Sequence, residues 1–123
     1  MDIKELLSRY MAGQRDFRNL NLMATNLKNI NLSQANLSGA NLTQANLTGS
    51  NFSQANLSGA NLTKANLTRT NLSQANLSDA ILTGANLTET NLIKANLSDV
   101  DLSDVDLNQT FLRGAIMSDG VTH

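Results

Sequence analysis

The stretch SDVDLSDVDL, residues 98–107, is the part of the chain that comes closest to a chemical site. Its carboxylates recur at short intervals, and two more aspartates lie 20 residues before and after Asp99. The whole candidate set is Asp79, Asp99, Asp101, Asp104, Asp106 and Asp119. Carboxylates stacked about 5 Å apart repel one another. Three interpretations stay open: a solvated acidic face, a contact surface for a basic protein partner, and a weak site for a hard cation such as calcium.

No other group of residues resembles catalytic machinery. The one histidine is the last residue, His123, and the chain has no cysteine. Serine and threonine are abundant, but no histidine in the pattern is available to activate them as nucleophiles. We therefore expect a protein that is not an enzyme, with no cofactor and no dedicated metal site.

Leucine recurs every five residues between residues 15 and 119, a period that belongs to neither a helix nor a continuous strand. The register holds 21 units, of which 18 are centred on leucine and three on Phe17, Phe52 and Met117. A small residue, usually alanine, stands two positions before the centre, and Asn or Asp stands one before it in 18 units. An Ala-Asn-Leu triplet predicts a short strand with Ala and Leu facing inward and Asn outward. The two remaining polar residues form a corner, where glycine suits a positive φ.

A longer repeat sets the length of one coil. Residues 31–50 match the chain at 16 of 20 positions after a shift of 20, but at only 11, 13 and 11 positions after shifts of 5, 10 and 15. Four sides of five residues predict a 20-residue coil, in which residues 20 apart stack as parallel strands about 4.8 Å apart. The 21 units make about five coils. A disordered tract rich in Asn and Ser would not need the strict Leu and Ala register.

The segment ANLSGANLTQANLT resembles the pentapeptide-repeat proteins, whose motif is A(D/N)LXX, and the resemblance covers residues 15–119. It implies an all-β fold, a right-handed quadrilateral parallel β-helix. Small stand-alone members of this kind are abundant in cyanobacteria and mostly have no assigned role. The departures from the pattern come late: Ile81, Asp101, Asp106, Phe111 and Ile116 stand in place of Asn, and Val100 and Val105 in place of Ala.

The resemblance also implies an alternative function. Quinolone-resistance members imitate duplex DNA and engage DNA gyrase, which requires a strongly negative rod. Here residues 1–70 carry seven basic and three acidic side chains, net +4, and residues 71–123 carry two basic and seven acidic, net −5. Ice binding by flat threonine arrays is a remote alternative. The threonine columns that would form such arrays fall on different sides of the coil: Thr43, Thr63 and Thr83 on one, Thr48, Thr68 and Thr88 on another.

Residues 1–14 break the five-residue register and predict a cap over the first coil. Apolar residues follow the spacing of one helix face, namely Ile3, Leu6, Leu7, Tyr10 and Met11. Asp2 with Glu5 resembles a capping box, and Gly13 suits a helix stop. A free membrane-surface helix would carry more basic residues. We therefore divide the chain into a capping helix with its link (1–14), a β-helix (15–119) and a tail (120–123).

The C-terminal end has no second helix, yet large apolar residues gather there: Ile93, Phe111 and Ile116 at outward positions, and Met117 as the last centre. Either the tail folds back over the last coil, with Val121 as its one apolar anchor, or two molecules meet at this end as a weak homodimer. We favour the dimer because four residues make a small lid, although Asp119 would then face its own copy.

Composition narrows the choice of partners. A net charge of −1 does not indicate the basic surface that binds nucleic acid. No apolar run approaches the ~20 residues that span a membrane. The charged start MDIKELLSRY lacks the apolar stretch of a signal peptide, so we expect a cytoplasmic protein. The sequence predicts a non-enzymatic interaction module that binds another protein through a flat face, with neither nucleic acid nor membrane as partner.

Overall fold

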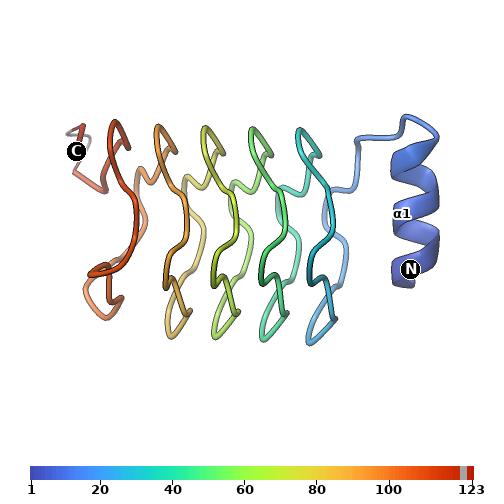
Figure 1. Ribbon diagram of the computed structural model, residues 1–123, viewed down its shortest axis with the longest axis horizontal. Coiled ribbons are helices and arrows are strands. Elements are labelled where there is room, and N and C mark those ends of the chain that lie inside the picture. Colours follow the sequence, from blue (N-terminus) through green and yellow to red (C-terminus); the bar gives the residue numbers. More distant parts are fainter. Residues whose placement is uncertain (120–121) are drawn as a thin grey trace.

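The computed structural model describes residues 1–119 and 122–123. The chain forms a rod of stacked coils, with the N-terminal helix across one end and the C-terminus at the other (Figure 1). Helix α1 spans Ile3–Met11, and the coils are joined by single β-bridges between parallel segments. The predicted fold is confirmed: the rod is a right-handed quadrilateral β-helix.

The stacking register is 20 residues on every side of the coil. We name the four sides A, B, C and D after their outward residues in the second coil, which are Asn36, Asn41, Asn46 and Asn51. On side B, for example, the bridges run from Asn21 to Asn41, then to Asn61, then to Ile81. Successive coils are also joined by backbone hydrogen bonds of 2.6–3.0 Å, such as that from the Leu62 N–H to the Ile81 carbonyl. The predicted four-sided coil is therefore confirmed.

The interior consists of one column of leucine and one column of small residues on each side. The central leucines from Leu22 to Leu97 are buried, and Phe52 takes the place of one of them, whereas Leu102 and Leu107 are only partly buried. On side D the small column is Ser50, Thr70, Thr90 and Thr110. The Thr70 hydroxyl donates a 2.7 Å hydrogen bond to the Leu47 carbonyl of the preceding coil, and Thr90 does the same to Leu67. Buried hydroxyls are tolerated here because each has an acceptor.

The corners are turns in which the second polar residue takes a positive φ. In the turn Leu32–Ala35, the Ala35 N–H donates to the Leu32 carbonyl at 3.1 Å and Gln34 has φ 63°, as a type II turn requires. The outward Asn completes the corner, because its Oδ1 accepts the N–H of the residue two positions later. On side B the acceptor is Asn41 and the donor is Thr43, at 3.1 Å.

Helix α1 is capped at both ends by its own sequence. The Asp2 side chain accepts the Glu5 N–H at 2.8 Å. At the other end the Gln14 N–H reaches the Arg9 carbonyl and the Gly13 N–H reaches the Tyr10 carbonyl, both at 3.0 Å. With Gly13 at φ 101°, this is a Schellman motif.

The helix lies over the first coil through one apolar face. Leu6 is fully buried, and Ile3, Leu7 and Tyr10 pack against the same core. The Tyr10 hydroxyl donates to the Ser33 carbonyl at 2.8 Å, and the Arg15 guanidinium lies 3.7 Å from the centre of the Tyr10 ring. Met11 is a correction to the predicted face, since 86% of it is exposed. It is the last residue of the helix, and Tyr10 makes the contact with the coil there.

The described residues of the tail fold back on the last strand. Thr122 forms an antiparallel bridge with Ile116, and the His123 N–H donates to the Ala115 carbonyl at 2.6 Å. Gly120 and Val121, the expected anchor, lie outside the described residues. In the parts of the chain that the structure describes, no helix is long and apolar enough to cross a bilayer.

Candidate partner-binding surface

All six aspartates of the predicted set are exposed and lie towards the C-terminal end of the rod. Asp79 and Asp99 occupy successive corners after side A, with φ 59° and 57°. They stack as predicted, because the Asp79 N–H donates to the Ser98 carbonyl at 3.0 Å. Asp119 follows the next strand of that side, where Ile116 pairs with Asn96.

The other three aspartates lie on a segment that leaves the stack. Bridges between residues 81 and 101 on side B and between residues 86 and 106 on side C would continue the register, but neither forms. Pairing resumes on side D, where Phe111 bridges Asn91. In Figure 1 this part of the fifth coil, drawn in orange to red, swings away from the coil before it. The expectation that every pair of residues 20 apart stacks is therefore wrong for Asp101 and Asp106.

Two features of the segment oppose stacking. Val100 and Val105 stand over Ala80 and Ala85, so a larger side chain meets a position sized for a methyl group; Val100 is buried, but Val105 is only partly so. With Asp99 just before it, the segment brings four aspartates together, and no basic residue lies between Lys94 and Arg113. Like charges on neighbouring sides favour separation. Consistent with the altered path, Asp104 and Gln109, the corner residues after sides B and C of the fifth coil, lack the positive φ of the corners before them.

The aspartates of this segment still perform the local task of the outward Asn. Asp101 Oδ1 accepts the Ser103 hydroxyl at 2.6 Å and the Ser103 N–H at 3.0 Å. These two hydrogen bonds, the hydroxyl first, hold the pKa of Asp101 below its usual value. Asp106 accepts the Asn108 N–H at 2.9 Å. The carboxylates are therefore fixed in direction although the segment is displaced.

The displacement opens a cleft of about 300 Å³ between the fourth coil and the segment. It is lined by Ala85, Asn86, Leu87, Thr88, Asp106, Asn108 and Gln109. Ala85 is half-buried, whereas Ala65 one coil earlier is buried, and Ile81 is 45% exposed. The five-residue pattern does not predict this cleft or the unpaired edge of the fourth coil beside it. The signal was available in the two valines, which break the small column in consecutive units.

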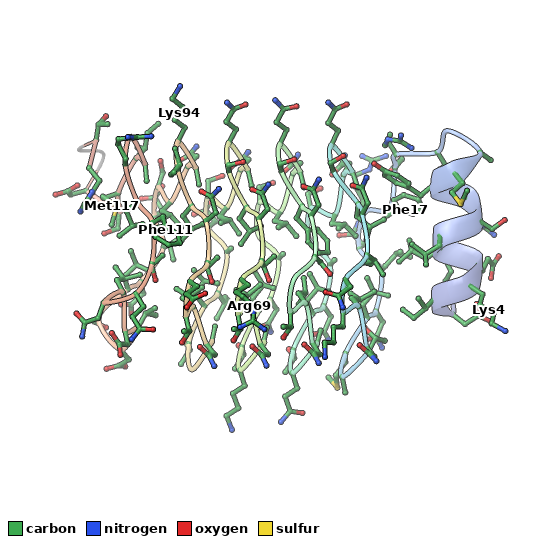
Figure 2. All side chains as sticks on the ribbon, in the orientation of Figure 1. Lys4, Phe17, Arg69, Lys94, Phe111 and Met117 are labelled. Atoms are coloured by element: carbon green, nitrogen blue, oxygen red, sulfur yellow. The ribbon has the colours of Figure 1, made fainter. Side chains whose placement is uncertain are left out.

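Apolar side chains form a second exposed group at the same end. Phe111 is 53% and Ile116 38% exposed, whereas Ile93 and Met117 are half-buried. Figure 2 shows Phe111 and Met117 near the C-terminal end of the rod. The tail occupies the strand edge at Gly114–Ile116, at the end where the sequence favours contact with a second molecule, but it leaves Phe111 exposed. The homodimer stays a prediction.

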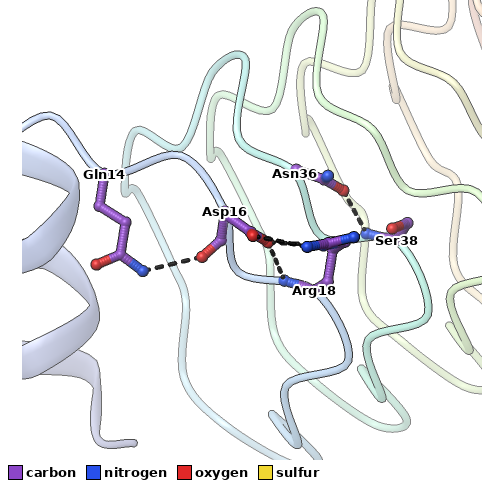
Figure 3. A network of polar contacts seen from close by, with 5 residues as sticks. All are labelled: Gln14, Asp16, Arg18, Asn36 and Ser38. Atoms are coloured by element: carbon purple, nitrogen blue, oxygen red, sulfur yellow. Dashed lines mark hydrogen bonds and ion pairs between the residues drawn. The ribbon is translucent and has the colours of Figure 1, made fainter.

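The opposite end of the rod carries an ion pair in the first coil (Figure 3). Arg18 donates from Nε and Nη2 to the two carboxylate oxygens of Asp16, both at 2.9 Å. The Arg18 side chain, and next its backbone N–H, hold the pKa of Asp16 below its usual value. Asp16 is the first-coil counterpart of Asn36, which accepts the Ser38 N–H at 3.1 Å. Gln14 ties the strand to the end of the helix by donating to the Asp16 carbonyl at 2.9 Å.

No set of three His, Cys, Asp or Glu side chains among residues 1–119 and 122–123 is placed to hold a metal ion. The cation interpretation of the acidic set therefore has no geometric support in the described chain.

A four-sided β-helix with a leucine at each centre and an Asn before it defines the class of pentapeptide-repeat proteins. The chain belongs to this family. The family described as pentapeptide repeats (8 copies) matches it over residues 16–54, 40–79 and 80–119. None of the curated proteins compared with the chain is similar enough to count as a match.

Several solved structures are similar. The pentapeptide repeat protein alr5209 from Nostoc PCC 7120 is 32% identical, covering 89% of this chain and 84% of its own, with a TM-score of 0.47. Rfr23 from the cyanobacterium Cyanothece 51142 is 30% identical, covering 92% and 93%, with a TM-score of 0.46. QnrB1, a plasmid-mediated fluoroquinolone resistance protein, is 17% identical, covering 83% and 72%, with a TM-score of 0.45.

Proposed function

We propose that the protein is a non-enzymatic interaction module that binds a basic protein partner through its acidic C-terminal surface. The surface comprises Asp79, Asp99, Asp101, Asp104, Asp106 and Asp119. The observation that supports this proposal is that all six carboxylates are exposed on a repetitive scaffold, with no catalytic constellation beside them in the described part of the chain. Membership of a repeat family also favours an interaction role, because solenoids present extended surfaces rather than closed pockets.

The scaffold suits binding because it fixes the direction of the charges before a partner arrives. Asp101 and Asp106 are each held by hydrogen bonds within the segment, and Asp79 is held by the backbone ladder. Preorganised charges lose little conformational entropy on binding. Exposed charges act mainly on the association rate, and salt weakens them. We therefore expect binding that depends strongly on ionic strength.

A capture experiment tests the proposal. The immobilised wild type is compared with the variant Asp99→Asn/Asp101→Asn/Asp104→Asn/Asp106→Asn in host extract. The control neutralises three basic side chains in the other half of the rod, as Lys28→Gln/Lys64→Gln/Arg69→Gln. The expected result is a basic protein that the wild type and the control retain, that the acidic variant loses, and that salt elutes. Equal capture by all three proteins would contradict the proposal. Inhibition of gyrase supercoiling that disappears in Asp99→Asn/Asp101→Asn would instead support the DNA-mimic alternative.

A further inference from the structure

We propose that the unpaired edge of the fourth coil receives a short, extended, basic segment of a partner protein by strand addition. This unpaired edge consists of the N–H groups of Leu82, Gly84 and Leu87 and the carbonyls of Ala80 and Ala85. The basic character of the partner rests on the proposed function, whereas the strand addition rests on the backbone geometry alone.

The third coil shows which hydrogen bonds the unpaired edge of the fourth coil lacks. On side B of the third coil, Leu62 and Lys64 donate their N–H groups to the carbonyls of Ile81 and Thr83 at 2.8 and 2.9 Å. The Ala60 carbonyl accepts the Ile81 N–H at 2.9 Å. Among the described residues, the corresponding groups of Leu82, Gly84 and Ala80 have no hydrogen-bond partner. Side B therefore offers two donors and one acceptor in a row.

Side C repeats the pattern and adds the cleft. Leu67 and Ala65 in the third coil pair with Asn86 at 2.8 and 2.9 Å, but Leu87 N–H and the Ala85 carbonyl find no partner in the described chain. The last donor of this side, the Glu89 N–H, bonds to Gln109 at 2.6 Å rather than to Asn108, which the 20-residue register would select. This one-residue slip marks where the displaced segment rejoins the stack. The cleft of about 300 Å³ lies between these groups and Asp106.

A row of unpaired strand groups is the feature that extended peptides use in β-augmentation. Leu82 and Leu87 are 1% and 2% exposed, and unpaired polar groups cost free energy when they are buried, so a ladder formed by an incoming strand that displaces residues 101–108 is favourable. Ile81, 45% exposed beside the edge, offers a contact for one apolar or β-branched side chain of the incoming strand.

The charges around the edge select the occupant. The displaced segment carries Asp101, Asp104 and Asp106. No lysine or arginine lies between Lys94 and Arg113 to offset their charge. An extended segment with lysine or arginine at alternate positions matches this surface, whereas an acidic segment would be repelled. Sides B and C meet at the corner of Thr83 and Gly84, so a segment that pairs with both must carry a residue such as Gly or Asn that tolerates the bend.

The test uses the full chain and a defined probe. The probe is an eight-residue peptide of lysine and threonine with one central glycine and blocked ends. One control peptide replaces lysine with glutamate. A second keeps every lysine but carries N-methyl groups on its threonine amides, which removes donors without changing the charge. The readouts are the dissociation constant and the hydrogen-exchange rates of single amides measured by NMR.

We expect the amides of Leu82, Gly84 and Leu87 to exchange at least tenfold faster than those of Leu62, Lys64 and Leu67 in the free protein. The basic peptide should slow the first three amides at least tenfold. The N-methylated peptide should bind at least tenfold more weakly, and the glutamate peptide should not bind. In Asp101→Asn/Asp104→Asn/Asp106→Asn, affinity for the basic peptide should fall while the N-methyl effect persists.

Two results would overturn the strand addition. If Leu82, Gly84 and Leu87 are already protected in the free protein, residues 101–108 close on the fourth coil and no edge is available. If the basic and N-methylated peptides bind equally, the contact is purely electrostatic. That second result would leave the proposed function standing, because the charge dependence would remain. If the charge dependence is lost but the N-methyl effect remains, the proposed function is contradicted and the strand addition stands.

Discussion

The outward Asn is the residue that makes each corner of the β-helix possible. Its Oδ1 accepts an N–H of the turn that the stacking ladder leaves unpaired, as Asn46 does for Thr48 at 3.0 Å. Ile81, Phe111 and Ile116 stand at this position without a side-chain acceptor, and all three are exposed. Each therefore gives up a corner hydrogen bond and presents an apolar side chain. All three lie at the end of the rod that carries the acidic surface.

Leu62 tests the leucine column in the middle of the stack. It is fully buried, so Leu62→Ala leaves a cavity and should lower the free energy of unfolding by about 2–5 kcal/mol. Leu62→Met, which conserves volume, should cost less than about 1.5 kcal/mol. Chemical denaturation of the three proteins measures both values. A loss below about 0.5 kcal/mol for the alanine variant would contradict the burial of this column.

Thr70 tests the buried hydroxyls of side D. Thr70→Val keeps the shape of the side chain but removes the 2.7 Å hydrogen bond to the Leu47 carbonyl. Because that carbonyl still accepts the Ser50 N–H, we expect a loss of only about 0.5–1.5 kcal/mol in the free energy of unfolding. Thr70→Ser, which retains the hydroxyl, separates the hydrogen bond from the packing. A valine variant more stable than the wild type would show that the hydroxyl does not stabilise the column.

Asp16 gives the first coil a dependence on pH. Its pKa is lowered in the folded state by Arg18, so the folded protein binds fewer protons than the unfolded chain near pH 4. The stabilisation is complete above the unfolded pKa and is lost as the pH falls through the folded pKa. The melting temperature of the wild type should exceed that of Asp16→Asn at pH 7, and the two should converge as the pH falls through the lowered folded pKa of Asp16. A difference that does not change with pH would assign the effect to something other than ionisation.

At the scale of elements, α1 stabilises the rod by covering the open end of the first coil. Leu6→Ala should lower the free energy of unfolding by about 2–5 kcal/mol, because Leu6 is buried against the core. Met11→Ala is the matched control, since a side chain that is 86% exposed should contribute less than about 0.5 kcal/mol. Thermal and urea unfolding measure both. An equal effect of the two substitutions would mean that the helix contacts the coil through a wider face than the structure has.

The coils and the helix could be predicted from the sequence because each rests on a repeated local signal. The central leucines recur every five residues from Leu22 to Leu97, and the fixed coil length of 20 residues determines which residues stack. The opening at residues 101–108 could not be predicted in the same way. There the leucine register continues through Leu102 and Leu107, and only the balance between ladder bonds, two valines and four carboxylates decides whether the coil closes. A terminal coil has a neighbour on one side only, so a small imbalance is enough.

At the scale of the whole molecule, the rod is electrically polar. Residues 1–70 carry net +4 and residues 71–123 net −5, so the helix end is basic and the opposite end is acidic. The overall charge of −1 hides this separation. Such an arrangement orients an approaching charged partner along the rod axis and favours contact at the end of opposite sign.

The same polarity governs the homodimer through the C-terminal end, which we propose as a weak association. Phe111 and Ile116 are exposed there and would meet their copies across a two-fold axis. Two acidic halves would meet as well, so repulsion should oppose the dimer at low salt. Light scattering over a concentration series should therefore show more dimer as sodium chloride rises from about 0.02 to 0.5 M, where the screening length becomes shorter. Phe111→Asn/Ile116→Asn should remain monomeric throughout. A wild type that stays monomeric to high micromolar concentration at every salt level would exclude the dimer and leave the tail as the only cover of this end.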